Sequence, residues 1–439
     1  MSEMVNTDSW YKSSCHIDTS LWGKTAPKLP DLEVLKGDIK TDVAIVGAGF
    51  CGLSSALHLA EAGVNVIVVD AHEPGWGASG RNGGQVIPGL KIQPDEIEKR
   101  FGKERGKAIV ETVGGAPQLV FDLIEKHGIE CDLRKSGWIQ LAKGPAGART
   151  TDAHVDQWER RGVGLEELGR SDIEVKVGTS SYESGFIDDR GGNLHPLKYA
   201  RGLANACIKL GVKIYRDSPS HGVKRVNENW IVETEAGSIS ADKVLVCTNG
   251  YTGSMLPGLS DSIVPVLTGV VATDPLSDNL KNKILPDRQG AADTQRLLSW
   301  FGIDREDRLI FGSRINSQRE LIDEKNFTFG IRRLKEIFPE VSDLKLQHLW
   351  TGRVALTLDH VPHIHKLGEG LYSGLGFNGR GVAMATMFGK ILASHCIGGA
   401  AHKEFLPLSP VPKVPFSRFR GQGIAVALTW KRMMDTLQP

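Results

Sequence analysis

Two short apolar runs, 43–46 and 66–69, stand on either side of a glycine-rich turn and an amphipathic stretch near the start of the chain. In that stretch, apolar residues recur at the i, i+3, i+4 and i+7 positions of one helix face, and Gly63 follows as a helix stop. Asp70 comes directly after the second run. The pattern predicts a buried strand, a tight turn, a helix and a second strand that ends at an acid.

The turn between the first strand and the helix has the sequence Gly47-Ala48-Gly49-Phe50-Cys51-Gly52. Its first glycine permits the tight turn, its second lets backbone N–H groups approach a pyrophosphate, and its third lets the helix pack closely on the strand. The positive end of the helix dipole favours phosphate groups. The carboxylate of Asp70 is placed to accept the ribose hydroxyls of an adenosine. Together these features predict a dinucleotide site.

The hydrophobic pattern farther along predicts both helices and strands. Helical patterns cover 94–127 and 151–170, and from 262 to 350 β-rich segments surround one helix near 329–338. Between these regions we expect a helix from Pro196 to about Leu210, a strand at 212–215, an antiparallel meander over 222–234, and a buried strand at 243–248 that ends at Asn249-Gly250-Tyr251.

This order of elements predicts an α/β nucleotide-binding domain that is split in sequence, with a second domain inserted between its parts. We assign residues 41–110, 181–260 and 351–398 to the nucleotide-binding domain, and 111–180 and 261–350 to an antiparallel-sheet α+β substrate domain. Residues 1–40 are predicted to be an N-terminal arm anchored by Trp10, Tyr11 and Trp22, and 399–439 a C-terminal extension.

Two more glycine-rich segments are candidates for ligand contact. Residues 75–85 leave the strand that ends at Asp70, so we expect them at the carboxyl edge of the sheet, where ligands bind. A strand at 371–374 leads into a second glycine turn, 376–381, and a helix. The N-terminus of that helix is suited to partial negative charge.

An arginine and three histidines between these segments are further candidates for binding a ligand or a metal. Arg353 can hold a carboxylate or a carbonyl through its planar donor fork, and a structural salt bridge is the alternative. His360, His363 and His365 lie close in sequence, but their spacing matches no metal motif, so no metal site is expected.

Composition narrows the class of protein. The chain has 439 residues, enough for two domains, and its 53 Lys and Arg nearly balance its 52 Asp and Glu, so no footprint for nucleic acid or an anionic membrane is expected. The six cysteines show no metal or disulfide spacing, and no signal peptide is recognisable.

The apolar run 423–430 is too short to span a bilayer and is expected to pack on the nucleotide-binding domain. We therefore expect a cytoplasmic protein without a spanning segment.

Five stretches, 46–63, 77–85, 190–197, 350–358 and 376–382, carry a resemblance to the D-amino-acid oxidase superfamily of flavoproteins, which includes glycine and sarcosine oxidases. The resemblance covers nearly the whole chain. It implies a Rossmann-like FAD-binding domain of the glutathione-reductase type, split in sequence, with an antiparallel-sheet α+β substrate domain. No histidine or cysteine lies within 77–85, and no cysteine lies between 248 and 395, where relatives sometimes link the flavin covalently, so we expect non-covalent FAD.

The glycine turns and the resemblance together imply a set of cofactor-binding residues. They are Gly47, Gly49, Phe50, Cys51, Gly52, Asp70, Ala71, Gly77, Ser79, Arg81, Asn82, Gly83, Gln85, Val223, Thr248, Asn249, Gly250, Gly376, Phe377, Asn378, Gly379, Arg380, Gly381 and Val382. The predicted catalytic residues are Arg314, Arg353 and Arg380, which stand where a polyamine-oxidising relative carries other side chains.

The reaction implied by the resemblance is oxidation of a C–N bond to an imine by hydride transfer to FAD, followed by hydrolysis. The expected substrate is γ-glutamylputrescine or a related polyamine-derived amine. An amino or imino acid is the alternative, because three guanidinium groups suit a carboxylate. The electron acceptor is oxygen or a respiratory carrier, and the oligomeric state is left open.

Other classes of protein remain open on the residues alone. An NAD-linked dehydrogenase would use the first turn and leave the other two unexplained. A flavin-bearing partner protein without activity would use all three. A disulfide reductase is disfavoured, because the chain has no closely spaced cysteine pair.

Overall fold

The parallel strands predicted around the first glycine turn lie side by side in one sheet of the computed structural model, which describes residues 17–317, 320, 322–399 and 405–412. Trp10, Tyr11 and the run 423–430 lie outside the described residues. Five strands run parallel in the spatial order β18 (Leu371–Leu375), β11 (Gly237–Val246), β1 (Gly37–Val46), β2 (Val66–Val69) and β8 (Lys213–Tyr215).

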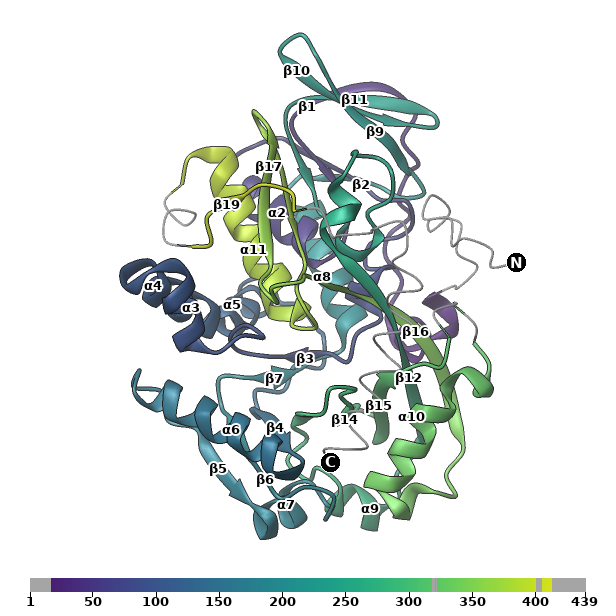
Figure 1. Ribbon diagram of the computed structural model, residues 1–439. Helices are drawn as coiled ribbons and strands as arrows, with labels where there is room; N and C mark the ends of the chain where they lie inside the picture. The colour runs from purple at the N-terminus through teal and green to yellow at the C-terminus, as the bar shows by residue number, and fades with distance from the viewer. Residues whose placement is uncertain (1–16, 318–319, 321, 400–404, 413–439) are drawn as a thin grey trace, which may run out of the picture.

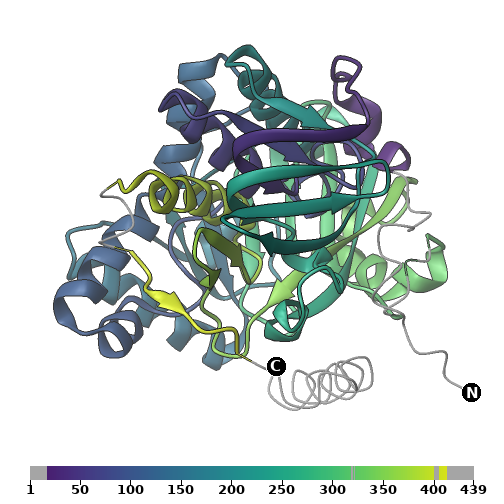
Figure 2. The ribbon, with the colours of Figure 1, turned by 90° about the horizontal axis from the view of Figure 1, so that it is seen from above.

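Additional strands extend this first sheet at both sides. β17 (His363–Gly368) is antiparallel to β18 and carries the short β19 (Leu408–Ser409), while β9 (Ser220–Val226) and β10 (Asn229–Thr234) form an antiparallel hairpin on β11. The predicted meander is therefore present. Figure 2 shows its teal strands beside β11, which separates them from the purple β1.

The first sheet is buried on both faces. One face packs on α2 (Phe50–Glu61), α8 (Pro196–Lys209) and α11 (Gly381–Ile397), whose inward side chains share one apolar core with α5 (Ala116–His127). On the other face, side chains of β1, β2, β10 and β11 form a second apolar core together with Leu259, Ile263 and Ala355. Burial on both faces explains why β1, β2 and β11 end in continuous apolar runs instead of alternating ones.

The second sheet is almost entirely antiparallel, as predicted, with one parallel pair between β4 and β13. It lies below the first sheet in Figure 1 and packs on α10 (Glu324–Ile337) and α7 (Arg170–Lys176). Its spatial order is β16 (Leu346–Leu356), β12 (Val264–Pro275), β15 (Arg308–Arg314), β14 (Trp300–Ile303), β13 (Gly290–Asp293), β4 (Trp138–Ala142), β6 (Ser184–Asp188) and β5 (Glu166–Gly169).

Further helices, turns and short strands lie between the elements of the two sheets along the chain. The first group leads into and follows the nucleotide turn: η2 (Ile17–Thr19), α1 (Leu21–Thr25), η3 (Ala78–Gly80) and the pair β3 (Gln85–Val86) and β7 (Gly192–Asn193). The second group consists of α-helices: α3 (Pro94–Phe101), α4 (Lys103–Gly114), α6 (Gly144–Glu159) and α9 (Asp278–Lys283). The remaining turns are η4 (Asn249–Tyr251), η5 (Leu259–Ser262) and η6 (Pro339–Val341).

The structure differs from the predicted domain boundaries at two strands. β6 was expected in the nucleotide-binding domain, but it pairs with β4 and β5 in the second sheet. The expected boundary at residue 351 falls inside β16, which pairs with β12 over 346–356. The sequence of each strand does not show which sheet it joins. The strands that hydrogen-bond to β6 and β16 place both of them in the second sheet.

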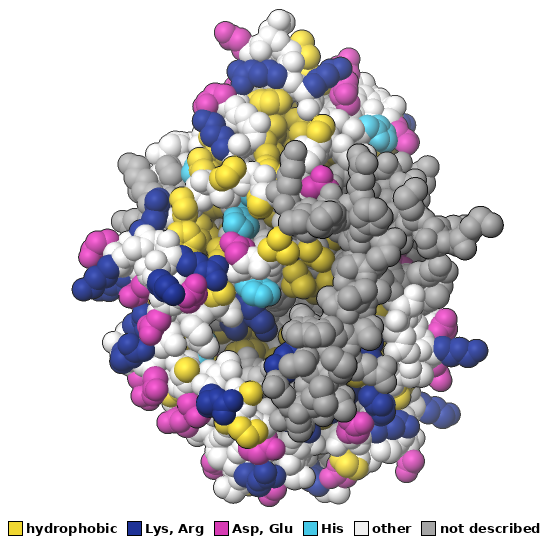
Figure 3. Space-filling model, in the orientation of Figure 1, with side chains coloured by type: hydrophobic (Ala, Val, Ile, Leu, Met, Phe, Trp, Pro, Cys, Tyr) yellow, Lys and Arg dark blue, Asp and Glu magenta, His cyan; other side chains and the backbone are white. Residues whose placement is uncertain are grey.

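The surface carries charges of both signs. Figure 3 shows Lys and Arg mixed with Asp and Glu over the described part of one face. No helix within the described ranges is long and apolar enough to cross a membrane.

Close contact between α2 and α11 makes Gly389 a sensitive position. A Cβ there would lie 2.5 Å from Cβ of Ser54 and 2.7 Å from the carbonyl oxygen of Cys51. We expect Gly389→Ala to lower the free energy of unfolding by about 1–3 kcal/mol, because the two helices must separate. Chemical denaturation of the FAD-free protein measures this. The exposed neighbour Lys390 provides the control: Lys390→Ala should change stability by less than about 0.5 kcal/mol. Equal stability of the two variants would contradict the packing argument.

Candidate functional site

A cavity of about 950 Å³ lies between the two sheets. Its volume is at the upper end of the range of about 300–1,000 Å³ that is typical of ligand sites. One part is lined by the first glycine turn, Asp70 and the 75–85 segment, and the other by β12, β15, β16 and the turn after β13. One continuous space therefore reaches from the predicted nucleotide turn to the second sheet.

Most residues singled out in the sequence line this cavity. They are Gly47, Gly49, Phe50, Cys51, Asp70, Ala71, Gly77, Ser79, Arg81, Asn82, Gly83, Gln85, Thr248, Asn249, Phe377, Asn378, Gly379, Arg380, Gly381 and Val382, together with Arg314 and Arg353. All three glycine-rich segments and all three arginines thus meet at one place.

Four of the predicted cofactor residues are not part of the lining. Gly52 faces the strand, as its packing role requires, and Gly250 lies in η4 beside residues that do line the cavity. The N–H of Gly376 donates to Oδ1 of Asn249. Val223 pairs with Val232 in the β9–β10 hairpin and packs on the core, so its side chain serves the fold at this position.

The nucleotide turn has the geometry that the glycine spacing predicted. Gly47 has φ +106°, a conformation that favours glycine, and a Cβ at Gly52 would lie 1.9 Å from the carbonyl oxygen of Gly47. A Cβ at Gly49 would lie 2.9 Å from Oγ of Ser79. Side chains at these positions would therefore collide with the backbone around the turn and with Ser79.

Asp70 is held at the end of β2 by two backbone donors. Its Oδ2 accepts from N–H of Ala48 at 2.6 Å, and its Oδ1 accepts from N–H of His72 at 2.9 Å. Burial and, to a smaller extent, the nearby Asp217 raise the pKa of Asp70 to about 6, against the effect of the two backbone bonds. Each carboxylate oxygen keeps a lone pair that can accept a ribose hydroxyl.

The 75–85 segment is shaped by its own side chains. Nδ2 of Asn82 donates to the carbonyl oxygens of Ala78 and Ser79, and its Oδ1 accepts from N–H of Gly84. Oγ of Ser79 accepts from N–H of Phe50 at 2.9 Å and so joins the segment to the start of α2. The polar residues of this segment therefore hold its backbone against the nucleotide turn.

Gln85 connects this segment to the second sheet. Its Nε2 donates to the carbonyl oxygens of Ala291 and Phe301, at 3.0 and 3.1 Å, while its Oε1 accepts from Nε1 of Trp138 at 2.9 Å. Both amide hydrogens are used in these bonds. Gln85 thus joins β4, β13 and β14 to the loop that borders the nucleotide turn.

The second glycine turn also ends at a helix N-terminus. Asn378 has φ +51°, and its side chain bonds to Thr357 and to the carbonyl oxygen of Gly376, which fixes the turn before α11. Arg380 is the N-cap residue of α11 and donates to the carbonyl oxygen of Pro88. Burial lowers the pKa of Arg380 to about 10, so the group stays charged at neutral pH.

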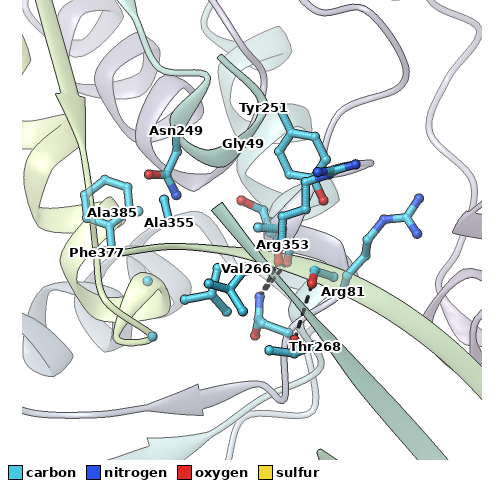
Figure 4. A pocket seen from close by; sticks show the side chains of 18 of the residues that line it. Gly49, Arg81, Asn249, Tyr251, Val266, Thr268, Arg353, Ala355, Phe377 and Ala385 are labelled. Carbon is cyan, nitrogen blue, oxygen red and sulfur yellow. Dashed lines mark hydrogen bonds between the residues drawn. The ribbon is translucent and has the colours of Figure 1, made fainter. Parts of the chain in front are cut away.

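The other two arginines face the cavity from the second sheet. Nη2 of Arg353 lies 2.8 Å from Oε1 of Glu320, and the guanidinium lies 5.8 Å from the ring of Tyr251. Figure 4 shows Arg353 beside Tyr251, with Val266 and Thr268 on the neighbouring strand. The guanidinium of Arg314 stacks on Phe329 at 3.9 Å. The salt bridge expected as the alternative for Arg353 is therefore present, and its role in holding a carboxylate or a carbonyl stays a prediction.

Sequence reasoning missed most of the cavity wall that the second sheet supplies. The missed residues include Val264, Val266, Thr268, Val270, Trp300 and the 293–298 segment, and Tyr251 of η4 was missed as well. A signal existed in β12, where the lining residues alternate with the period of two that places them on one face of a strand. The sequence did not reveal which face looks into the cavity.

Two residues of the histidine cluster, His363 and His365, are used for structure, while His360 lines the cavity. His363 bonds to Oγ of Ser409 and Oδ1 of Asp359, and Nδ1 of His365 bonds to the carbonyl oxygen of Ser409. Within the described ranges, no group of three potential ligand side chains is arranged to hold a metal ion.

Comparisons with known proteins agree with this geometry. Residues 42–395 match the family model described as FAD dependent oxidoreductase. The chain is 31% identical to γ-glutamylputrescine oxidoreductase of Escherichia coli over 401 residues, covering 91% of this chain and 93% of the relative. It is 30% identical to the probable oxidoreductase OrdL of Rhizobium meliloti over 434 residues, covering 97% of each chain.

Solved structures show the same fold. Glycine oxidase from Geobacillus kaustophilus superposes with a TM-score of 0.71 at 18% identity, covering 82% of this chain and 96% of that one. L-proline dehydrogenase from P. horikoshii superposes with a TM-score of 0.68 at 19% identity, covering 83% of this chain and 95% of that one. The predicted α/β fold and the predicted cofactor, FAD, are confirmed. The NAD-linked dehydrogenase and the inactive partner protein are set aside.

The environment of Asp70 predicts a pH dependence for FAD binding. Ribose hydroxyls donate to the ionised carboxylate, and that form becomes scarce below pH 6. We expect the dissociation constant for FAD to rise as pH falls below about 6, by at most about tenfold per pH unit. Quenching of FAD fluorescence by the FAD-free protein between pH 5 and 8 measures this.

Two variants separate Asp70 from other titrating groups. Asp217→Asn removes the neighbouring negative charge and should move the transition to lower pH. Asp70→Asn should bind FAD more weakly at every pH and lose the transition. A transition that persists unchanged in Asp70→Asn would assign the titration to another group.

Proposed function

The chain belongs to the family of FAD-dependent oxidoreductases, and on that premise we propose that it oxidises γ-glutamylputrescine or a related polyamine-derived amine. Enzymes of this family act on amines or amino acids. The observation that carries the choice of substrate is the 31% identity to the E. coli γ-glutamylputrescine oxidoreductase, which extends over both sheets of the fold. The proposed products are an imine and, after hydrolysis, a carbonyl compound and an amine.

The three glycine-rich segments would hold FAD along the first sheet. Asp70 would accept the ribose hydroxyls, and the N-terminus of α2 would face the pyrophosphate. Arg380 and the N-terminus of α11 would lie near the part of the ring that gains negative charge on reduction. When bound, FAD supplies the acceptor for a hydride from the carbon next to the amine nitrogen. We propose that it binds non-covalently.

The residues of the second sheet would place the amine and keep water away from it. Val266 and Trp300, together with Phe377 of the second glycine turn, give the cavity apolar walls, so a bound amine would lose most of its contact with water. Positioning of this kind makes the transfer effectively unimolecular and needs no strong protein base.

The arginines would also control the protonation of the substrate. A neutral amine is the reactive form, and nearby positive charges disfavour an ammonium ion. Arg314, Arg353 and Arg380 all line the cavity, with the charge of Arg353 partly balanced by Glu320. Their combined field would lower the pKa of a bound amine.

The same arginines favour a second candidate substrate class. Arg353 presents a planar fork that pairs with a carboxylate. γ-Glutamylputrescine carries its carboxylate far from the oxidised amine, whereas an amino or imino acid carries it on the reacting carbon. An amino or imino acid is therefore the alternative substrate. The acceptor would be oxygen or a respiratory carrier, and the reaction would take place in the cytoplasm.

Anaerobic mixing with candidate substrates tests the proposal. The panel contains γ-glutamylputrescine, free putrescine, a cyclic imino acid and a D-amino acid, and the readout is loss of the yellow absorbance of the flavin. We expect γ-glutamylputrescine to bleach the flavin fastest. Faster bleaching by the amino or imino acid would support the alternative. Yellow colour that stays with the polypeptide after acid precipitation would contradict non-covalent binding.

Arg353→Met tests the role of the cavity arginine. Loss of a charged hydrogen bond, worth about 1.5–3 kcal/mol, should raise KM by roughly 10- to 100-fold for a substrate with a carboxylate. KM for putrescine, which has none, should change little. Arg332→Met removes an exposed arginine on α10 and serves as the control. Equal losses for both substrates would contradict carboxylate recognition by Arg353.

A further inference from the structure

One wall of the cavity is a tight loop between two strands of the second sheet. The loop, residues 294–299, joins β13 to β14, and Thr294 through Leu298 line the cavity. Its ends are closed by a bond from N–H of Asp293 to the carbonyl oxygen of Ser299 at 2.9 Å. Arg296 near its tip is exposed, while Leu297 is buried. The loop therefore forms part of the cavity wall.

A buried carboxylate holds this loop from inside. Oδ1 of Asp293 accepts from N–H of Gln295 and from N–H of Ser299, both at 3.1 Å. Backbone donors at both ends of the loop thus share one oxygen. Hydrogen bonds to an ionised acceptor are roughly twice as strong as those between neutral groups. The shape of the loop accordingly depends on the charge of this side chain.

The other oxygen of Asp293 faces the packed side of the second sheet. Oδ2 accepts from the hydroxyl of Tyr182 at 3.2 Å and lies 3.9 Å from Nη2 of Arg333 on α10. Arg333 also donates to Oε1 of Gln295, so the cation contacts both the acid and the loop. The carboxylate therefore connects α10 and Tyr182 to the cavity wall.

We propose that Asp293 is a positioning residue, whose negative charge keeps the 294–299 loop closed as a wall of the substrate part of the cavity. Loss of that charge loosens the loop and weakens binding of the amine. This inference rests on the proposed function for the identity of the substrate. The effect on the loop itself does not depend on the substrate.

The surroundings of Asp293 make its charge sensitive to mild acid. Burial raises the pKa of Asp293 to about 6, although two backbone donors, Arg333 and Tyr182 act in the opposite direction. The groups that face it are Tyr182 and Arg333, with Glu183 beyond the tyrosine and Glu336 paired with the arginine. The loop should consequently be ordered above pH 6 and loosen as pH falls through that value.

Hydrogen exchange of a peptide that spans 294–299 in the FAD-loaded protein tests the loop directly. At pH 7.5 we expect exchange in Asp293→Asn to be roughly tenfold faster than in the wild type, because neutral bonds replace charged ones. In the wild type, exchange relative to the intrinsic rate should rise as pH falls from 7 to 5. In Asp293→Asn that rise should disappear.

Asp304→Asn is the matched control. Asp304 caps the neighbouring turn between β14 and β15 by accepting from N–H of Glu306 and N–H of Arg308, and it does not line the main cavity. Its substitution should speed exchange in its own turn and leave 294–299 unchanged. A loop that responds equally to both substitutions would overturn the proposal, since the effect would then be a general loosening of the sheet.

Tyr182→Phe provides a second variant that keeps the acid. It removes the donor to Oδ2 and should move the pH transition of loop exchange upward by a few tenths of a unit. This variant also preserves the test if Asp293→Asn does not fold. A transition at the same pH in Tyr182→Phe and in the wild type would overturn the assignment to Asp293.

Steady-state kinetics with a substrate that bleaches the flavin gives the functional readout. At saturating FAD and pH 7.5 we expect KM in Asp293→Asn to rise roughly three- to tenfold with little change in kcat. The KM of the variant is divided by the KM of the wild type at each pH. Because titration of the free substrate amine affects both values equally, it does not change this ratio. A constant ratio from pH 5 to 8 would overturn the proposal. If no amine bleaches the flavin, the proposed function fails, while the exchange experiment still decides the role of Asp293.

Discussion

The structure depends on the common direction of four neighbouring strands. β18, β11, β1 and β2 run parallel, so their carboxyl ends meet at one edge of the first sheet. The first glycine turn, Asp70, the segment after Cys247 and the second glycine turn all begin at that edge. Segments that are more than 300 residues apart in sequence therefore line a single cavity. No interaction between their side chains is needed to bring them together.

The two sheets contribute different kinds of groups to the cavity. The first sheet supplies backbone and glycine positions, which suit a large ligand whose phosphates must approach the chain closely. The second supplies side chains, namely the apolar face of β12 and two arginines. Gln85 joins the two parts through bonds to β13, β14 and Trp138. These three bonds tie the loop that borders the nucleotide turn to the cavity wall of the second sheet.

Burial shifts the pKa values of the charged groups in the cavity and so makes their charge depend on pH. The same desolvation raises the pKa of Asp70 and of Asp293 to about 6 and lowers that of Arg380 to about 10. Both acids are stabilised by backbone donors and so remain ionised at neutral pH. One acid faces the proposed nucleotide part and the other holds the substrate wall. Mild acid would therefore affect both halves of the site through separate residues.

The sequence by itself determined the strand order around Gly47, the turn geometry, the acid at Asp70 and the approach of three glycine-rich segments, because local spacing and strand direction dictate these features. It did not determine that β6 belongs to the second sheet, that β12 turns Val266 toward the cavity, or that Asp293 holds a loop. Those properties depend on partners distant in sequence. A strand of either sheet shows the same apolar pattern, and an acid before a loop shows no sign of its burial until the chain has packed around it.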